Sequence, residues 1–348
     1  MTIRSVSLLA VSLCFLASES RAQLQVPNVG TLQPLTGESY WGELADDSYG
    51  AVTVGDFTGD GRLDAVVLER GSPMLLETPE AFYTSIYASV RAHAIATVRS
   101  GGSDLLASLG PDGLVLHRWD GGRGAFESET LALGPWRGGG ALAAGDLDGD
   151  ERGDLVGVAL SDPLLVQVLL GSRSTSRLSQ GTSFSFRTTT PTHSVFLLDW
   201  DGDGRDEIAV VTDRGVEVYT GNGRLLGGST AVRAGALGAT LRMSSSSRDQ
   251  IAFVQDAAVG GGEEVYLFDS TGLEGPFALG TLGVVGLAAA DEDGDGDEEL
   301  LFSVTSAPAV YILKNLTGTG ATFDPARHMR SIPVGDPARD PASNRAGL

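Results

Sequence analysis

The sequence is poor in cysteine, lysine and aromatic residues, and it has no long hydrophobic run. Cys14 is the single cysteine and Lys314 the single lysine, while aromatic residues make up 7% of the chain. One cysteine excludes an intramolecular disulfide framework. Cationic side chains number 24 against 45 acidic ones, for a formal net charge of −21. Such a chain is unsuited to nucleic acid, because binding there depends on cations that displace phosphate counterions.

The chain is instead rich in hydrophobic residues and glycine. Hydrophobic residues reach 42%, which is too many for a disordered acidic chain and enough for a large core. The 48 glycines indicate frequent turns. Apolar residues follow a period of two, as at Val216 and Val218, and a helical period is nearly absent. The sequence therefore predicts an all-β fold of many short strands, without a membrane span.

Residues 1–22 have the pattern of a secretory signal peptide. Arg4 precedes an apolar run from Val6 to Ala17, and small residues lead to a cleavage site after Ala22. The run is too short to span a bilayer, which needs roughly 20 residues. Leu13 stands where a lipoprotein cysteine needs a small neighbour, so Cys14 is not expected to carry lipid. We expect a cysteine-free monomer that is secreted, periplasmic or on the cell surface.

Four acidic stretches repeat along the chain with a common spelling. Each has an aspartate at the first position and Asp or Glu at the ninth, and they begin at Asp56, Asp146, Asp199 and Asp291. Their starts are separated by one or two multiples of about 47 residues. Two degenerate copies keep the following apolar run and lose the acidic stretch: Asp104-Leu-Leu-Ala aligns with Asp154-Leu-Val-Gly, and Asp249-Gln-Ile-Ala-Phe aligns with Asp206-Glu-Ile-Ala-Val. A repeat of this length is one supersecondary unit that buries its faces against its neighbours.

Each acidic stretch lies between two β-rich runs, so the unit contains short strands joined by an acidic hairpin loop. This matches the blade of a β-propeller. We predict a propeller over residues 23–335 with six four-stranded blades. The spacing of the repeats also allows seven blades. Residues 23–47 are expected to complete the terminal blade, and residues 336–348 to form a flexible tail.

The acidic loops have the spacing of a site for a hard cation. Oxygens at the first, third, fifth and ninth positions, with a backbone carbonyl at the seventh, converge on one ion as the loop curls around it. Ca²⁺ is favoured over Mg²⁺, because its larger shell accepts more oxygens in a flexible geometry. We expect up to four Ca²⁺ ions, and the predicted metal ligands are Asp56, Thr58, Asp60, Asp64, Asp146, Asp148, Asp150, Asp154, Asp199, Asp201, Asp203, Glu207, Asp291, Asp293, Asp295 and Glu299.

The four loops are not equal. Those that begin at Asp199 and Asp291 keep every acidic position and a glycine at the sixth, so we expect them to bind most strongly. Thr58 removes one charge from the first loop. Glu151 stands at the sixth position of the second loop, where a sharp bend favours glycine. A solvated acidic turn is the alternative for any one loop, and four copies at one period argue against it.

The full motif reads Gly-Asp-x-x-Gly-Asp-Gly-x-x-Asp, as at Gly55 to Asp64, followed by a strand and then by Val-Tyr-x-x-x-Asn before a glycine turn, as at Val310 to Asn315. It resembles the FG-GAP/VCBS repeat of integrin-α-like β-propellers, over most of residues 50–324. The resemblance implies ions in the blade hairpins that stiffen the ring, and ligands that meet loops on the opposite face. An EF-hand is excluded, because a strand follows each loop where an EF-hand has a helix.

No catalytic motif is visible in the sequence. None of the four histidines has a partner at metal-ligand spacing: His93, His117, His193 and His328. We therefore predict a calcium-binding propeller that acts as an interaction or adhesion module for an extracellular protein or glycan, without catalysis. A propeller-based polysaccharide lyase or hydrolase and a lectin-like sugar binder are the alternatives. Lectin-like binding needs exposed aromatics on several blades, and the tryptophans do not recur at the repeat period. Arg152-Gly153-Asp154 spells an adhesion tripeptide, but Asp154 is expected to be a ligand rather than displayed.

Overall fold

The computed structural model describes residues 49–61, 64–69, 72–76, 83–85, 92–100, 103–111, 113–131, 136, 140–171, 182–233, 235–242, 248–257, 261–290, 298–304, 309–313 and 329–333. Every regular element within them is a β-strand. The predicted signal peptide (1–22), the start of the predicted propeller (23–48) and the predicted tail (336–348) lie outside the described residues. Among the described residues, no helix has the length and hydrophobicity to cross a membrane.

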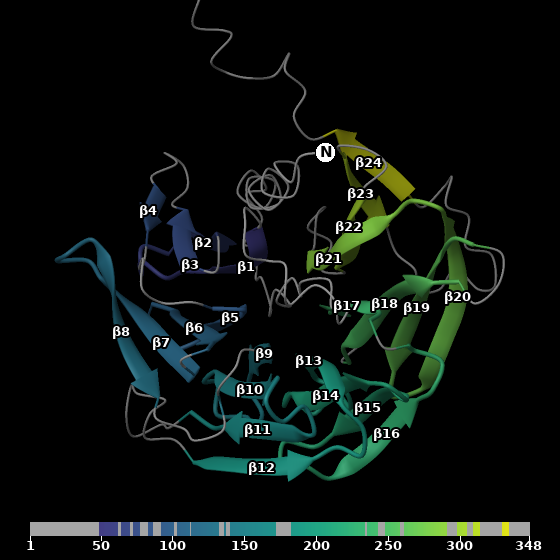
Figure 1. The fold of residues 1–348 in the computed structure, drawn as a ribbon, viewed down its shortest axis with the longest axis horizontal. Coiled ribbons are helices and arrows are strands. Elements are labelled where there is room, and N and C mark those ends of the chain that lie inside the picture. Colours follow the sequence, from purple (N-terminus) through teal and green to yellow (C-terminus); the bar gives the residue numbers. More distant parts are fainter. Residues whose placement is uncertain are drawn as a thin grey trace, which may run out of the picture.

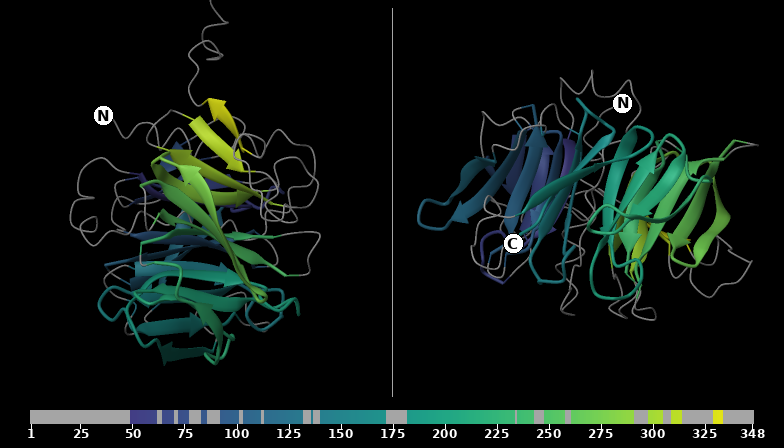
Figure 2. Two further views of the ribbon diagram at one scale, coloured as in Figure 1. Left: turned by 90° about the vertical axis from the view of Figure 1, so that its right-hand side faces the viewer. Right: turned by 90° about the horizontal axis from the view of Figure 1, so that it is seen from below.

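The fold is a β-propeller. Within the described part of the chain the strands form six four-stranded antiparallel sheets, arranged as blades around a common centre (Figure 1). Each blade is a meander, with its strands hydrogen-bonded in chain order. The first strands lie innermost and contact the first strands of neighbouring blades, while the fourth strands lie at the rim. The side views show the blades standing next to one another around the ring (Figure 2).

The strand bounds, blade by blade, are as follows. Blade 1 has β1 (Tyr49–Gly55), β2 (Asp64–Glu69), β3 (Ser72–Leu76) and β4 (Tyr83–Ser85); blade 2 has β5 (Ala94–Val98), β6 (Leu105–Gly110), β7 (Gly113–Asp120) and β8 (Ala125–Leu131); blade 3 has β9 (Gly140–Gly145), β10 (Asp154–Ala159), β11 (Leu165–Leu169) and β12 (Ser183–Arg187). Blade 4 has β13 (Thr192–Leu198), β14 (Glu207–Thr212), β15 (Gly215–Tyr219) and β16 (Leu225–Ser229); blade 5 has β17 (Leu237–Leu241), β18 (Gln250–Asp256), β19 (Glu263–Asp269) and β20 (Gly272–Gly280); blade 6 has β21 (Val284–Ala290), β22 (Glu299–Val304), β23 (Ala309–Leu313) and β24 (Met329–Pro333).

In each of the two end blades, the four described strands follow one another directly in the sequence. Blade 1 uses β1 to β4 and blade 6 uses β21 to β24. The prediction that residues 23–47 complete the terminal blade is therefore not needed for a four-stranded sheet at either end.

The hydrophobic core lies between adjacent blades rather than within one sheet. Phe57 of blade 1 packs with Ile95 of blade 2, and Leu142 of blade 3 belongs to a cluster with residues of blade 2. Phe196 of blade 4 meets Phe253 of blade 5 edge-on, with ring centroids 6.1 Å apart. Side chains from two sheets thus share each buried layer, so neighbouring blades stabilise each other.

The second strands of blades 2, 3 and 4 depart from the predicted alternation of apolar and polar residues. Every residue of β6, β10 and β14 is buried. A blade has a neighbour on each face, so both sides of such a strand are covered and no position faces water. Outer strands such as β12 and β16 are exposed or half-buried instead.

Candidate metal centre

The four acidic stretches occupy the same place in the fold, the loop from the first to the second strand of a blade. They join β1 to β2, β9 to β10, β13 to β14 and β21 to β22. Because every blade runs its strands in the same order, the strand ends that flank these loops lie on one face of the ring. We name them the 56, 146, 199 and 291 loops after their first residues.

The first aspartate of each described loop holds the loop in shape. Asp146 Oδ1 accepts the N–H of Gly149 at 2.8 Å, and its Oδ2 accepts that of Glu151 at 2.7 Å. Asp56 and Asp199 make the corresponding bonds in their own loops. The fourth and sixth residues of all three loops have positive φ. The chain therefore curls around its first carboxylate before any ion is considered.

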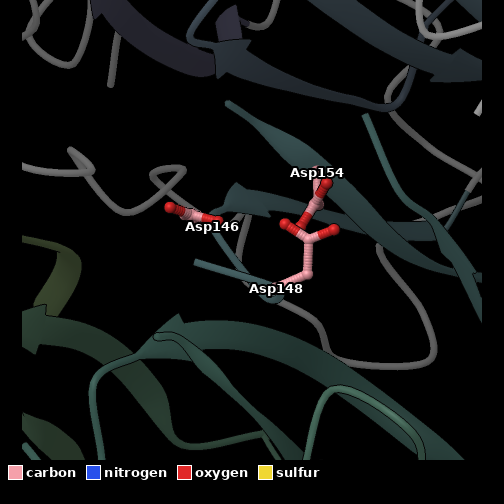
Figure 3. Close-up of side chains that lie close together, drawn as sticks. All are labelled: Asp146, Asp148 and Asp154. Atoms are coloured by element: carbon pink, nitrogen blue, oxygen red, sulfur yellow. The ribbon is translucent and has the colours of Figure 1, made fainter. Parts of the chain in front are cut away.

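Two of the loops bring three carboxylates together. In the 146 loop, one oxygen from each residue lies within 4.8 Å of the others for Asp146, Asp148 and Asp154. Figure 3 shows the Asp148 and Asp154 side chains pointing toward each other with Asp146 at one side. In the 199 loop the same holds for Asp199, Asp201 and Glu207. Oxygen donors alone are the ligand set that hard cations prefer, and like charges this close repel one another.

The ninth-position carboxylates are buried at the base of their loops. Asp154 accepts the N–H of Leu147 at 2.7 Å, and Glu207 accepts that of Trp200 at 3.0 Å. Burial raises the pKa of each carboxyl to about 7, and these hydrogen bonds with backbone amides offset only part of the rise. Burial likewise raises the pKa of Asp64 to about 6. A cation at these loops would favour the ionised form that burial opposes.

Other predicted ligands are placed differently. Asp150 and Asp203, at the fifth positions, lie outside the converging groups and accept the N–H of the residue two ahead, at 3.0 and 2.9 Å. Among the described residues, the acids of the 56 loop do not form such a group. There Asp64 accepts the N–H of Thr58 at 2.9 Å. The predicted ligands Asp291, Asp293 and Asp295 lie outside the described residues, and Glu299 is buried at the start of β22.

A set of contacts that the sequence did not reveal joins each loop to the next blade. The residue at the eighth loop position donates its N–H to the carbonyl of the first position in the preceding blade, and the pairs are Asp104–Asp56, Gly153–Arg99, Asp206–Asp146, Asp249–Asp199 and Glu298–Arg242. In four of the five pairs the eighth residue is acidic and its carboxylate accepts the first residue's N–H in return. We call each pair an inter-blade clasp.

The clasp between Asp206 and Asp146 shows how closely the blades approach. Its two hydrogen bonds are both 2.7 Å long. A β-carbon on Gly145 would lie 2.1 Å from Asp206 Oδ2, so only glycine leaves room for this carboxylate. Burial raises the pKa of Asp206 to about 6. Gly153 has no carboxylate, so its clasp with Arg99 has the backbone bond alone.

The two degenerate blades carry arginine where the acidic loops carry their first aspartate. Arg99 follows β5 and Arg242 follows β17, as Asp56 follows β1. Arg242 Nε lies 3.4 Å from Asp249 Oδ1, and this positive charge partly offsets the pKa rise that burial gives Asp249. Arg99 acts in the same direction on the pKa of Asp104. In both of these blades an arginine cation therefore acts on the acid at the eighth loop position.

The register corrects the sequence alignment of blade 2. Leu105 pairs with Val98, as Asp154 pairs with Gly145 in blade 3. Asp104 therefore corresponds to the eighth loop position, and not to the ninth position that an alignment with Asp154 implies.

Several side chains singled out in the sequence are structural. Trp200 is buried and packs on Phe268 with ring centroids 4.7 Å apart. His117 is buried between Ser108 and Ser128, at 2.7 Å from each hydroxyl. Asp154 of the adhesion tripeptide is 0% exposed and is not displayed, as expected.

The comparisons with known proteins show the fold and no family. No family model matches the chain, and no curated protein matches it. Three solved structures are similar: BBS1N in complex with ARL6DN, with a TM-score of 0.53 and 9% identity over 81% of this chain and 92% of that chain; a streptogramin B lyase, with 0.51 and 10% over 88% of each; and a lectin of Agrocybe aegerita that recognises non-reducing terminal N-acetylglucosamine, with 0.52 and 16% over 81% and 79%. At these identities the likeness supports the β-propeller fold alone, and the FG-GAP/VCBS resemblance stays a prediction.

Replacing Glu151 by glycine should stabilise the protein. Glu151 has φ of 63° at the bend, a conformation that costs a residue with a β-carbon roughly 1 kcal/mol. We expect a gain of about that size in the free energy of unfolding, measured by denaturant titration in chelator. Glu151→Ala is the control, because it removes the carboxylate and keeps the β-carbon. An equal gain from alanine would show that charge, rather than backbone strain, is relieved.

The metal-free protein should lose stability as pH rises from about 4 to 7. The folded pKa of Asp154 and Glu207 is about 7, while carboxyls of the unfolded chain titrate near 4. In this window the folded state holds protons that the unfolded state has released. The free energy of unfolding therefore falls as pH rises, by on the order of 1 kcal/mol per pH unit for each carboxyl. Melting curves of metal-free protein across this range test the slope. Asp154→Asn should flatten it, and the exposed control Asp256→Asn should not; a melting temperature that climbs from pH 5 to 7 contradicts the expectation.

Proposed function

We propose that this protein is an exported calcium-binding β-propeller that serves as an interaction module for a protein or glycan, without catalysis of its own. The observation that carries the proposal is the convergence of three carboxylates within a single loop in two adjacent blades. Calcium is the ion that fits best. The donors are all oxygens, the loops supply both carboxylates and backbone, and flexible multi-oxygen shells suit Ca²⁺ better than the strict octahedron of Mg²⁺.

The electrostatics of the ring support a structural role for the ion. Carboxylates at the bases of the 146 and 199 loops are buried with raised pKa, so their ionised forms are disfavoured without a cation. The two degenerate blades place Arg99 and Arg242 at the first loop position instead. Blades with an acidic loop would use an ion, and blades without one use an arginine.

Export is consistent with this ion. The predicted signal peptide would deliver the chain to a compartment where calcium is abundant, and extracellular modules bind calcium with dissociation constants of roughly 10⁻⁴ to 10⁻³ M. Sites with three or four carboxylates, such as the 199 loop, would be filled there. The predicted membership of the FG-GAP/VCBS family fits the same picture.

The fold does not choose the partner. The similar structures include a protein complex, a lyase and a lectin. A lectin-like function has the neighbouring lectin in its favour, but the described tryptophans offer no repeated aromatic platform: Trp136 and Trp200 are buried, and Trp119 packs against Phe126. We therefore favour an interaction module over a repeated sugar site. A glycan array with and without calcium separates the two, since calcium-dependent binding of one sugar class would establish the lectin.

Calcium should raise the melting temperature of chelator-treated protein, and magnesium should raise it much less. Binding to the folded state alone adds about 2.7 kcal/mol per site at a hundredfold excess over the dissociation constant. Asp201→Ala removes a converging ligand of the 199 loop, so this variant should bind one ion fewer by calorimetry and gain less stability from calcium. Asp256→Ala, an exposed acid at the end of β18, is the matched control. If calcium leaves the melting temperature of the wild-type protein unchanged, the proposed calcium site is wrong.

A further inference from the structure

The acids at the eighth loop positions belong to no predicted ion site, yet each holds a first-position residue of the preceding blade. Asp249 of blade 5 accepts the N–H of Asp199 at 3.1 Å and donates its own N–H to the Asp199 carbonyl at 2.9 Å. Asp199 is in turn one of the three converging acids of the 199 loop. The peptide groups on both sides of this aspartate are therefore fixed by a residue 50 positions later in the chain.

We propose that the eighth-position carboxylates are positioning residues for the ion site of the preceding blade, with Asp249 serving the 199 loop and Asp206 serving the 146 loop. The inference deepens the calcium function proposed above and rests on it. It gives each ion site an outer shell on a second blade, so that an ion would link two blades instead of closing one hairpin.

The geometry explains how such a residue would act. A first-position aspartate must aim its carboxylate into the loop, and its direction follows the backbone that carries it. Two hydrogen bonds from the next blade hold that backbone, and the Asp249 side chain is only 8% exposed, so water cannot readily replace it. Residues that orient metal ligands in this way typically contribute about 10- to 100-fold to metal affinity.

Blade 5 has a clasp residue but no acidic loop of its own. Arg242 stands at its first position. Its clasp residue Asp249 nevertheless supports the loop of blade 4. Asp206 lies beside the converging Glu207 and clasps Asp146, so the 146 and 199 loops are also joined to each other.

Terbium luminescence can test this at the 199 loop alone. Trp200 lies between the converging acids Asp199 and Asp201, so Tb³⁺ bound in this loop is excited through its indole. The second positions of the other described loops hold Phe57 and Leu147. Trp200→Phe, a residue that the 56 loop already accepts there, identifies how much of the signal comes from this site.

Asp249→Ala should weaken Tb³⁺ binding at the 199 loop by about tenfold or more, because it removes the acceptor that holds Asp199. Asp249→Asn keeps an acceptor oxygen without the charge and should restore most of the affinity. Asp256→Ala, at the far end of the strand β18 that Asp249 precedes, is the control and should match the wild type. Asparagine as weak as alanine would mean that charge alone acts, and this overturns positioning. Unchanged affinity in Asp249→Ala also overturns it, whereas absence of Tb³⁺ and Ca²⁺ binding by the wild type overturns the proposed function itself.

Discussion

At every blade boundary where both partners are described, an amide at the eighth loop position donates to the carbonyl at the first position of the preceding blade. The arrangement of the acidic loops on this face of the ring depends on the inter-blade clasp. The clasp fixes where each loop begins and how close the next blade comes. A hydrogen bond of this kind contributes about 1 kcal/mol net, and one to a carboxylate contributes more. Buried acids such as Asp206 supply that second bond in four of the five clasps.

The clasps create an electrostatic problem that the protein meets in two ways. They concentrate carboxylates on one face of the ring, in a protein whose formal net charge is already −21. In blade 5 the problem is met with Arg242, 3.4 Å from Asp249. In blades 3 and 4 the acids of the 146 and 199 loops converge, and under the proposed function a calcium ion supplies the positive charge. An arginine is always present, whereas an ion depends on the compartment, so the rigidity of these two blades would follow the calcium concentration.

Local features of the sequence predicted the fold and part of the site. A curled acidic loop is specified by residues close together in the chain, and the 146 and 199 loops converge largely as their spacing indicates. The fifth-position acids Asp150 and Asp203 stand apart, because they accept the N–H of the residue two ahead. The clasps could not be predicted, since their partners lie 48 to 60 positions apart and their acids look like further loop acids. The sequence alignment places Asp104 one position too late, because it matches acid to acid while the strand register decides the pairing.

Residue-resolved hydrogen exchange tests most directly whether ions bound in the acidic loops tighten the contacts between blades. The N–H groups of Asp206 and Asp249 report on the clasps to the 146 and 199 loops. The N–H of Ala257 is bonded to the Gly262 carbonyl at 2.8 Å and reports on blade 5 at the opposite face of the ring. We expect calcium added to metal-free protein to slow exchange at Asp206 and Asp249 and to leave Ala257 nearly unchanged. Equal slowing at all three amides, or no change at the two clasps, would contradict an ion that acts across the blade boundary.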